Sequence, residues 1–155
     1  MSLEVIIGNY QEITEIPESW LTALEEVAHE AAAIALAHAA IDDSPLCHLA
    51  TLEIALVDDA TSARVHQDFM NIDGATDVIT FHHGEIVIGV EVAQRQALEF
   101  GEPLAREILR YLVHGLLHLA GHEDTEPAER IAMEAAQETI ISTLWSAELQ
   151  VRLLR

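Results

Sequence analysis

The sequence has few of the residues that would place it in several protein classes. Its single cysteine, Cys47, excludes an internal disulfide framework, so a reducing cytoplasm is the expected compartment. It contains no apolar run long enough to span a bilayer, and its first residues lack the basic start and apolar stretch of a signal peptide. We therefore expect no membrane partner, and we expect Cys47 to be a small buried hydrophobic residue.

Positive charge is also scarce. All seven basic residues are arginines, no lysine occurs, and 27 acidic residues give a formal net charge of −20. An acidic surface repels polyanions, whereas nucleic-acid binding normally draws on clustered lysine and arginine. Taken alone, the composition argues against RNA or DNA as a partner, unless the functional face is less negative than the protein as a whole.

The apolar pattern predicts alternating strands and helices in a single domain over residues 1–155. The expected order is β-α-β-α-β-β-α-α-α, with strands at 3–7, 49–57, 77–81 and 85–89 and helices at 17–40, 58–69, 90–100, 104–120 and from 125 onward. This order predicts an α/β (α+β mixed) fold, with a mixed four-stranded sheet packed against about five helices. The strongly apolar helix 104–120 is expected to lie at its centre.

Several local features refine this prediction. Asp58 or Asp59 is expected to cap the second helix, and Pro127 should lie in the first turn of the last one. Trp20 and Trp145 are interpreted as packing residues. The apolar face of the last helix would consist of Ile131, Ile140, Ile141 and Leu144.

The stretch 114–124 (HGLLHLAGHED) carries a pattern that is typical of a metal site. His114 and His118 are four residues apart, so on a helix they lie roughly 40° apart on one face and can converge on one cation. Gly121 follows, and a glycine just past a helix end can turn the chain back. Asp124, or alternatively His122, can then supply a third ligand. Three protein ligands leave a position open for water, which favours metal-assisted hydrolysis.

The same stretch excludes one class of metalloenzyme. Zinc peptidases of the H-E-x-x-H type place a glutamate directly after the first histidine as the general base. Here that position holds Gly115. A metal-activated water remains as the nucleophile, and no catalytic side chain is assigned, although Glu123 is a candidate base.

Three blocks of the sequence resemble the YbeY endoribonuclease family. Residues 114–121 match the first eight positions of its H-G-x-L-H-L-x-G-Y-D-H signature. Residues 73–81 (DGATDVITF) are similar to its D-x-P-T-D-V-L-S-F block, and residues 84–88 (GEIVI) to its G-D-I-V-I run. The order of strands and helices agrees as well, so the resemblance covers nearly the whole chain.

The resemblance implies a zinc-dependent, single-strand-specific endoribonuclease that acts in maturation of the 16S ribosomal RNA 3′ end and in ribosome quality control. Ribosomal RNA and the small ribosomal subunit would be its partners. His114 and His118 would be metal ligands. Zinc is the expected metal, although two histidines and a carboxylate also suit iron, nickel or manganese.

The chain departs from the family pattern at two places. Where the signature ends Gly-Tyr-Asp-His, this chain has Gly121-His122-Glu123-Asp124, so a carboxylate occupies the third ligand position. Its oxygen binds zinc at a distance similar to that of an imidazole nitrogen, but its extra negative charge weakens the metal as a Lewis acid.

The second departure is Met70, which follows an aromatic residue where the family carries an arginine. Arginine suits phosphate contacts because its planar fork matches two oxygens, and methionine cannot replace it. Arg64 or Arg95 is a possible substitute. Two alternatives therefore stay open, namely a metallohydrolase of a less anionic substrate and a metal-binding ribosome-assembly factor without nuclease activity.

Overall fold

The computed structural model of the protein describes residues 2–154. Its elements follow the predicted order, with one 3-10 helix (η1) and one short terminal helix added. They are β1 (Glu4–Asn9), α1 (Glu18–Ala37), η1 (Pro45–His48), β2 (Thr51–Val57), α2 (Asp59–Met70), β3 (Val78–Phe81), β4 (Glu85–Gly89), α3 (Val90–Phe100), α4 (Leu104–Leu119), α5 (Pro127–Leu144) and α6 (Ala147–Arg152).

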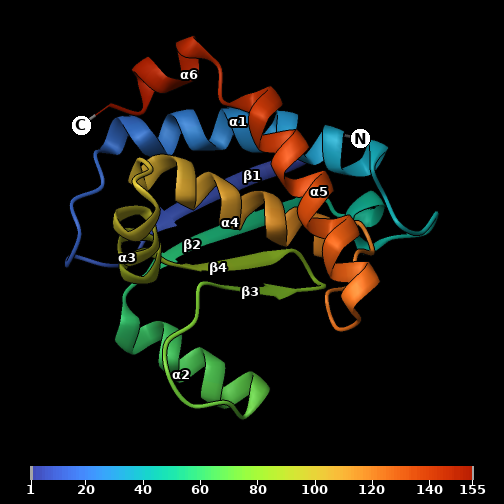
Figure 1. The fold of residues 1–155 in the computed structure, drawn as a ribbon, viewed down its shortest axis with the longest axis horizontal. Helices are drawn as coiled ribbons and strands as arrows, with labels where there is room; N and C mark the ends of the chain where they lie inside the picture. Colours follow the sequence, from blue (N-terminus) through green and yellow to red (C-terminus); the bar gives the residue numbers. More distant parts are fainter. Residues whose placement is uncertain (1, 155) are drawn as a thin grey trace.

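The four strands form one mixed sheet in the order β1-β2-β4-β3 (Figure 1). Strands β1, β2 and β4 are parallel, and β3 pairs antiparallel with β4 through a tight turn at residues 82–84. The prediction of an α/β fold with a mixed four-stranded sheet is therefore confirmed. Strand β3 is an edge strand, so one of its two sides pairs with no other strand of this sheet.

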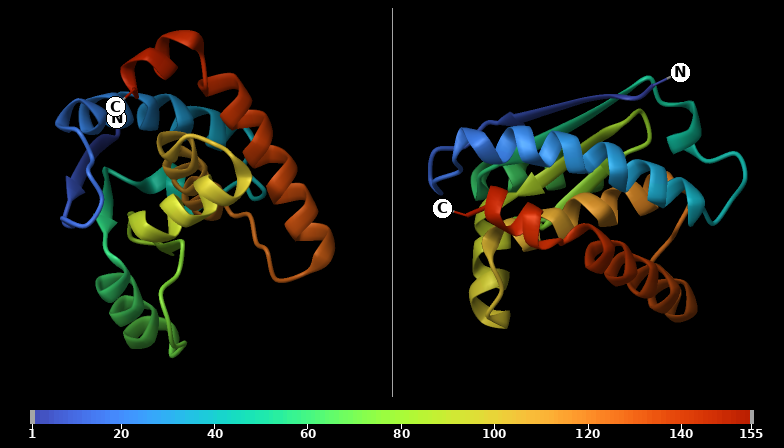
Figure 2. Two further views of the ribbon diagram at one scale, coloured as in Figure 1. Left: turned by 60° about the vertical axis from the view of Figure 1, so that its left-hand side comes forward. Right: turned by 90° about the horizontal axis from the view of Figure 1, so that it is seen from above.

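The helices are distributed unevenly over the two faces of the sheet. Helices α1 and α4 pack across one face, α5 covers α4 from outside, and α6 contacts α1 (Figures 1 and 2). On the opposite face lies α2, above a small apolar cluster of Val57, Ile79 and Val87. The main core thus fills the space between the sheet and the layer of α1 and α4.

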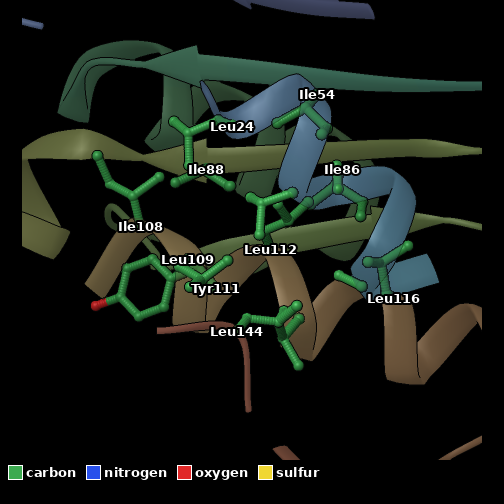
Figure 3. Close-up of a cluster of buried hydrophobic side chains, with 14 of the residues drawn as sticks. Leu24, Ile54, Ile86, Ile88, Ile108, Leu109, Tyr111, Leu112, Leu116 and Leu144 are labelled. Carbon is green, nitrogen blue, oxygen red and sulfur yellow. The ribbon is translucent and has the colours of Figure 1, made fainter. Parts of the chain in front are cut away.

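Helix α4 lies at the centre of this core, as predicted. Twelve of its sixteen residues are buried, and Ile108, Leu109, Leu112 and Leu116 meet Ile54, Ile86 and Ile88 of the sheet (Figure 3). In the last two turns, His114 and His118 are only half buried, with 24% and 23% of their side chains exposed. The imidazoles therefore lie where the buried helix reaches the protein surface.

Four predicted local features are present in the structure, and one short helix was not predicted. Asp58 caps α2 by accepting a hydrogen bond from the Thr61 backbone N–H at 2.8 Å, and Pro127 begins α5. Trp20 is buried in the core, and Trp145 packs at its rim. The short helix α6 was not predicted, although Ser146 caps it through the Leu149 N–H.

Two predictions about single residues are wrong. Ile131 is 68% exposed, because the buried face of α5 runs instead through Met133, Gln137, Ile140, Ile141 and Leu144. Cys47 is exposed rather than buried, since η1 directs Leu46 into the core and leaves the neighbouring thiol outside. The Cys47 thiol donates a hydrogen bond to the Ser44 carbonyl at 3.0 Å.

No helix within residues 2–154 has both the length and the apolar character needed to cross a membrane.

Gly115 packs tightly against the Ile86 side chain of strand β4. A Cβ atom built there would lie 2.8 to 3.0 Å from three side-chain atoms of Ile86, which is itself fully buried. The glycine after the first histidine is thus a packing requirement, because strand β4 passes directly beneath it. A larger residue such as the peptidase glutamate has no room here.

Substitution Gly115→Ala is expected to destabilise the protein by about 1–2 kcal/mol. Overpacking a tight core costs about 1–3 kcal/mol, and the better helix propensity of alanine returns roughly 1 kcal/mol at most. Urea denaturation measures the difference. Ile86→Val removes the methyl group nearest to the new side chain and should relieve part of the clash. The loss of unfolding free energy in the double mutant should therefore be smaller than the sum of the losses in the two single mutants. If the two losses of unfolding free energy simply add in the double mutant, the contact between position 115 and Ile86 is not tight.

Candidate metal centre

A tight turn after α4 brings residues 122–124 back towards the two histidines. Gly121 has φ of 94°, and two hydrogen bonds close the turn, from His122 N–H to the Leu117 carbonyl at 2.9 Å and from Gly121 N–H to the His118 carbonyl at 3.0 Å. This pair of bonds is the Schellman motif, which requires a left-handed residue that glycine supplies without strain. The proposed role of Gly121 in the sequence analysis agrees with this geometry.

Three ligand-type atoms meet beside the turn. His114 Nε2 and His118 Nε2 are 3.2 Å apart, and Asp124 Oδ2 lies 3.6 Å from the first and 3.5 Å from the second. In a tetrahedral site with bonds of about 2.0–2.1 Å, neighbouring ligand atoms are about 3.3–3.4 Å apart. The triangle therefore has the size that a zinc-sized cation needs, with its fourth corner open.

The second nitrogen of each histidine has an acceptor. His114 Nδ1 lies 2.8 Å from Gln137 Oε1, and His118 Nδ1 lies 3.0 Å from the backbone carbonyl of His122. Both acceptors select the tautomer with hydrogen on Nδ1, which leaves a lone pair on each Nε2. Two lone pairs facing each other at 3.2 Å repel, and a cation between them removes that repulsion.

The electrostatic setting favours the neutral, ligand form of His118. Burial lowers the pKa of its imidazole, and the neighbouring His114 lowers it further, while Asp124 opposes both effects. A histidine must be neutral to bind a metal, so a lowered pKa reduces competition from protons.

The three polar residues that follow Gly121 have different surroundings, which bears on the choice of the third metal ligand. His122 points away from the triangle, with its Nε2 2.6 Å from the backbone carbonyl of His38. Asp124 belongs to the triangle, and Glu123 is exposed on the wall of the neighbouring cleft. The geometry thus favours Asp124 over His122 as a third ligand.

A cleft of about 320 Å³ opens beside the triangle. It lies between the C-terminal end of α4, the edge strand β3 and the end of α2, and its walls are formed by Met70, Val78, Ile79, Thr80, His82, His118, Glu123 and Asp124. No arginine is among them. Met70 stands in this wall, so the second departure from the family pattern lies directly at the site.

Neither arginine suggested as a substitute lines the cleft. Arg95 is held by Asp59 through two hydrogen bonds, the shorter of 2.8 Å. Arg64 is on α2 but is not among the cleft residues. Arg130 is not among the predicted site residues, but its Nε donates to the backbone carbonyl of Asp124 at 3.4 Å. This arginine stabilises the turn that carries the third ligand.

Gln137 is also not among the predicted site residues, because it lies 23 positions from His114, the histidine that it contacts. Its amide is itself oriented, since Gln137 Nε2 donates to Glu138 at 3.1 Å. Glu138 in turn accepts from Arg110 at 2.9 Å, and the same guanidinium binds Glu102 and Glu107. The hydrogen bond from Arg110 lowers the pKa of Glu138, so this carboxylate stays ionised and keeps the Gln137 oxygen turned to His114.

A pair of helical histidines, an aspartate after a left-handed glycine and an open cleft define a candidate metallohydrolase centre. Comparison with known proteins gives the family. A model described as "Endoribonuclease YbeY" matches residues 6–145, and the chain belongs to this family.

Individual relatives agree. A Moorella thermoacetica protein named endoribonuclease YbeY is 32% identical over 159 residues, which cover 90% of this chain and 96% of that protein. A namesake from Rhodopirellula baltica is 36% identical over 128 residues, 76% of this chain and 64% of that protein. One from Myxococcus xanthus is 37% identical over 103 residues, 58% of this chain and 35% of that protein. The chain thus spans less than two thirds of the last two relatives.

A solved structure shows a similar fold. The solution structure of TM1509 from Thermotoga maritima superposes with a TM-score of 0.63 at 25% identity, covering 96% of this chain and 92% of that one.

Substitution Gln137→Leu is expected to weaken binding of Zn²⁺ about 10- to 100-fold, because the hydrogen bond that orients a metal-binding histidine is typically worth that much. A competition titration with a chromogenic chelator measures the change. Thr139→Ala is the matched control, since its exposed hydroxyl lies on the same helix and bonds only to the Ala135 carbonyl. Equal zinc affinity in the two variants would contradict the role of Gln137.

Proposed function

We propose that His114, His118 and Asp124 bind a divalent metal ion and that this centre hydrolyses phosphodiester bonds. The observation that carries the proposal is the triangle of ligand atoms, with edges of 3.2, 3.5 and 3.6 Å, beside an open cleft. A metal bound there would supply an activated water and polarise a phosphoryl oxygen.

The residues of the chain have separate parts in this reaction. His114 and His118 donate Nε2 lone pairs, and Gln137 keeps the first in the correct tautomer. Glu123, exposed on the cleft wall, is the candidate base that takes a proton from the attacking water. The water oxygen forms a bond to phosphorus, one bridging P–O bond breaks, and the departing oxygen takes up a proton.

Family membership supports RNA as the substrate. The relatives carry the name endoribonuclease, so the proposed activity is internal cleavage of single-stranded RNA in ribosomal RNA processing. We further propose that the protein works in the cytoplasm on small-subunit RNA, at 16S 3′-end maturation and in ribosome quality control. Zinc is the proposed metal because two imidazoles and a carboxylate with one open position are a catalytic zinc donor set.

One observation favours a second candidate function. The cleft wall combines Glu123 and Asp124 with no arginine, and it holds Met70 where the family carries one. Such a cleft gives little attraction to a polyanion. A metallohydrolase of a less anionic substrate is therefore the alternative. An assembly factor that keeps the metal for structure is a further alternative, because its cleft would not have to bind a substrate.

Zinc-loaded wild-type protein is expected to cut single-stranded RNA, and His114→Ala should reduce the rate at least about 100-fold because a ligand is lost. A gel assay with an end-labelled oligoribonucleotide and its duplex measures both rate and strand preference. Exposed His29, on α1 away from the site, provides the control His29→Ala. Equal cleavage by wild type and His114→Ala would indicate a contaminating nuclease. Absence of cleavage in both, with retained binding to ribosomal subunits, would favour the assembly factor.

The third ligand can be tested separately from catalysis. Asp124→Asn should lose most of its affinity for Zn²⁺, because a neutral amide oxygen is a much poorer ligand than a carboxylate. His122→Asn should bind zinc as wild type does. Elemental analysis after gel filtration and a chelator titration give the stoichiometry and affinity. The opposite result would assign the ligand to His122.

A further inference from the structure

Three aromatic rings form a cluster that takes no part in the metal centre. The Phe69 ring meets the Phe81 ring edge-on, with centroids 5.1 Å apart, and the His83 ring stacks on Phe81 at 5.5 Å. Phe69 is on the last turn of α2, Phe81 ends β3, and His83 is in the following turn. We call these three side chains the aromatic platform.

The platform exposes apolar surface that the core does not use. Phe69 is 68% exposed, and the His83 side chain is 70% exposed. A phenylalanine in that position stabilises the fold little, because most of its ring remains in water. The Phe69 ring contacts the Phe81 ring edge-on, and the helix that carries it ends at Asn71 with φ of 55°, whose N–H bonds to the Gln67 carbonyl at 3.0 Å.

The platform lies just across an edge of the sheet from the cleft. Side chains alternate along a strand, so Thr80 faces the cleft while Phe81 packs on the opposite face with the cluster under α2. At the end of α2, Met70 lines the cleft and Phe69 joins the platform. Because β3 is the edge strand, a flexible chain can pass from cleft to platform without crossing another strand.

We propose that the aromatic platform stacks an unpaired nucleobase of an RNA strand whose phosphate occupies the cleft. This inference rests on the proposed endoribonuclease function and names how that site recognises its substrate. Unpaired bases stack on exposed aromatic and histidine rings, whereas a duplex keeps its bases covered. The platform therefore selects single strands by the base.

Stacking also suits the charge of this protein. The cleft has no arginine, and His83 is 3.4 Å from the carboxylate of Glu85, so phosphates find few cations here. Base stacking needs no phosphate contact and depends little on salt. For single strands each phosphate contact adds about −0.7 to the slope of log affinity against log salt. We expect a slope no steeper than about −1.5.

The test measures stacking without cleavage. A cleavage-resistant phosphorothioate oligoribonucleotide containing 2-aminopurine, a fluorescent adenine analogue that is quenched when it stacks, is titrated with zinc-loaded protein. Wild type should quench it, and Phe69→Ala should bind it about 5- to 100-fold more weakly. Phe69→Tyr should retain the affinity, because it keeps the ring. Phe100→Ala is the matched control, since Phe100 is equally exposed at the end of α3 and outside the platform.

An abasic oligonucleotide completes the assignment. Removing the stacked base should weaken wild type about as much as Phe69→Ala does, and Phe69→Ala should then lose nothing more. In the cleavage assay the variant should raise KM and leave kcat nearly unchanged, because the ring positions the strand and does not touch the reacting atoms.

The possible failures are distinguishable. Wild type that cleaves RNA without quenching, or Phe69→Ala that binds like wild type, would overturn the platform and leave the nuclease intact. Quenching without any cleavage would support the platform and overturn the nuclease. A steep salt slope that Phe69→Ala does not alter would assign recognition to phosphate contacts instead.

Discussion

The packing of α4 against the sheet is the constraint on which the rest of this structure depends. At Gly115 the helix backbone approaches β4 so closely that an added Cβ would lie 2.8 to 3.0 Å from the Ile86 side chain, which would have to shift. This contact sets the rotation of the helix, because the residues around Gly115 must face the core. His114 and His118 are then directed to the side of the helix that leaves the sheet at its β3 edge. The metal-type triangle is thus a consequence of core packing as much as of the motif itself.

Much of this could be predicted from the sequence, because the deciding interactions are local. The spacing of the two histidines, the left-handed glycine and the alternation of strand residues each depend on a few neighbouring positions. Gln137 and the aromatic platform could not be found that way, since each depends on contacts between segments that are distant in the sequence. Arg130 lies only six residues from Asp124, but its contact there depends on how the turn before α5 folds. The exposure of Cys47 was mispredicted for a related reason. Cysteine is usually buried, but the short 3-10 helix turns its neighbour Leu46 inward instead.

The distribution of charge explains how an acidic chain can belong to a nuclease family. Several of its few arginines have structural partners: Arg95 binds Asp59, Arg152 binds Glu26, and Arg110 joins three carboxylates. Burial lowers the pKa of Arg110, but its hydrogen bonds to those carboxylates outweigh that effect and raise it. These ion pairs link helices, and their carboxylates compete with phosphates for the guanidinium groups. Under the proposed function, recognition of RNA would rest on the metal and on base contacts more than on the protein's own charge.

Asp124 also reduces the positive charge that the proposed metal centre would present to a phosphate. A third histidine would leave a zinc centre with two positive charges, whereas a carboxylate leaves it with one, so attraction to a phosphate weakens. The negative charge of Asp124 raises the pKa of His118 and so opposes the effect of burial, which lowers it. Metal binding is favoured because an anionic ligand adds direct attraction to the cation. A metal site built this way would hold its ion firmly and activate water less strongly, so binding of the strand would have to contribute more to kcat/KM. Because the described lining residues of the cleft include no arginine, the proposed stacking of a base beside the edge strand would be the means of binding that strand.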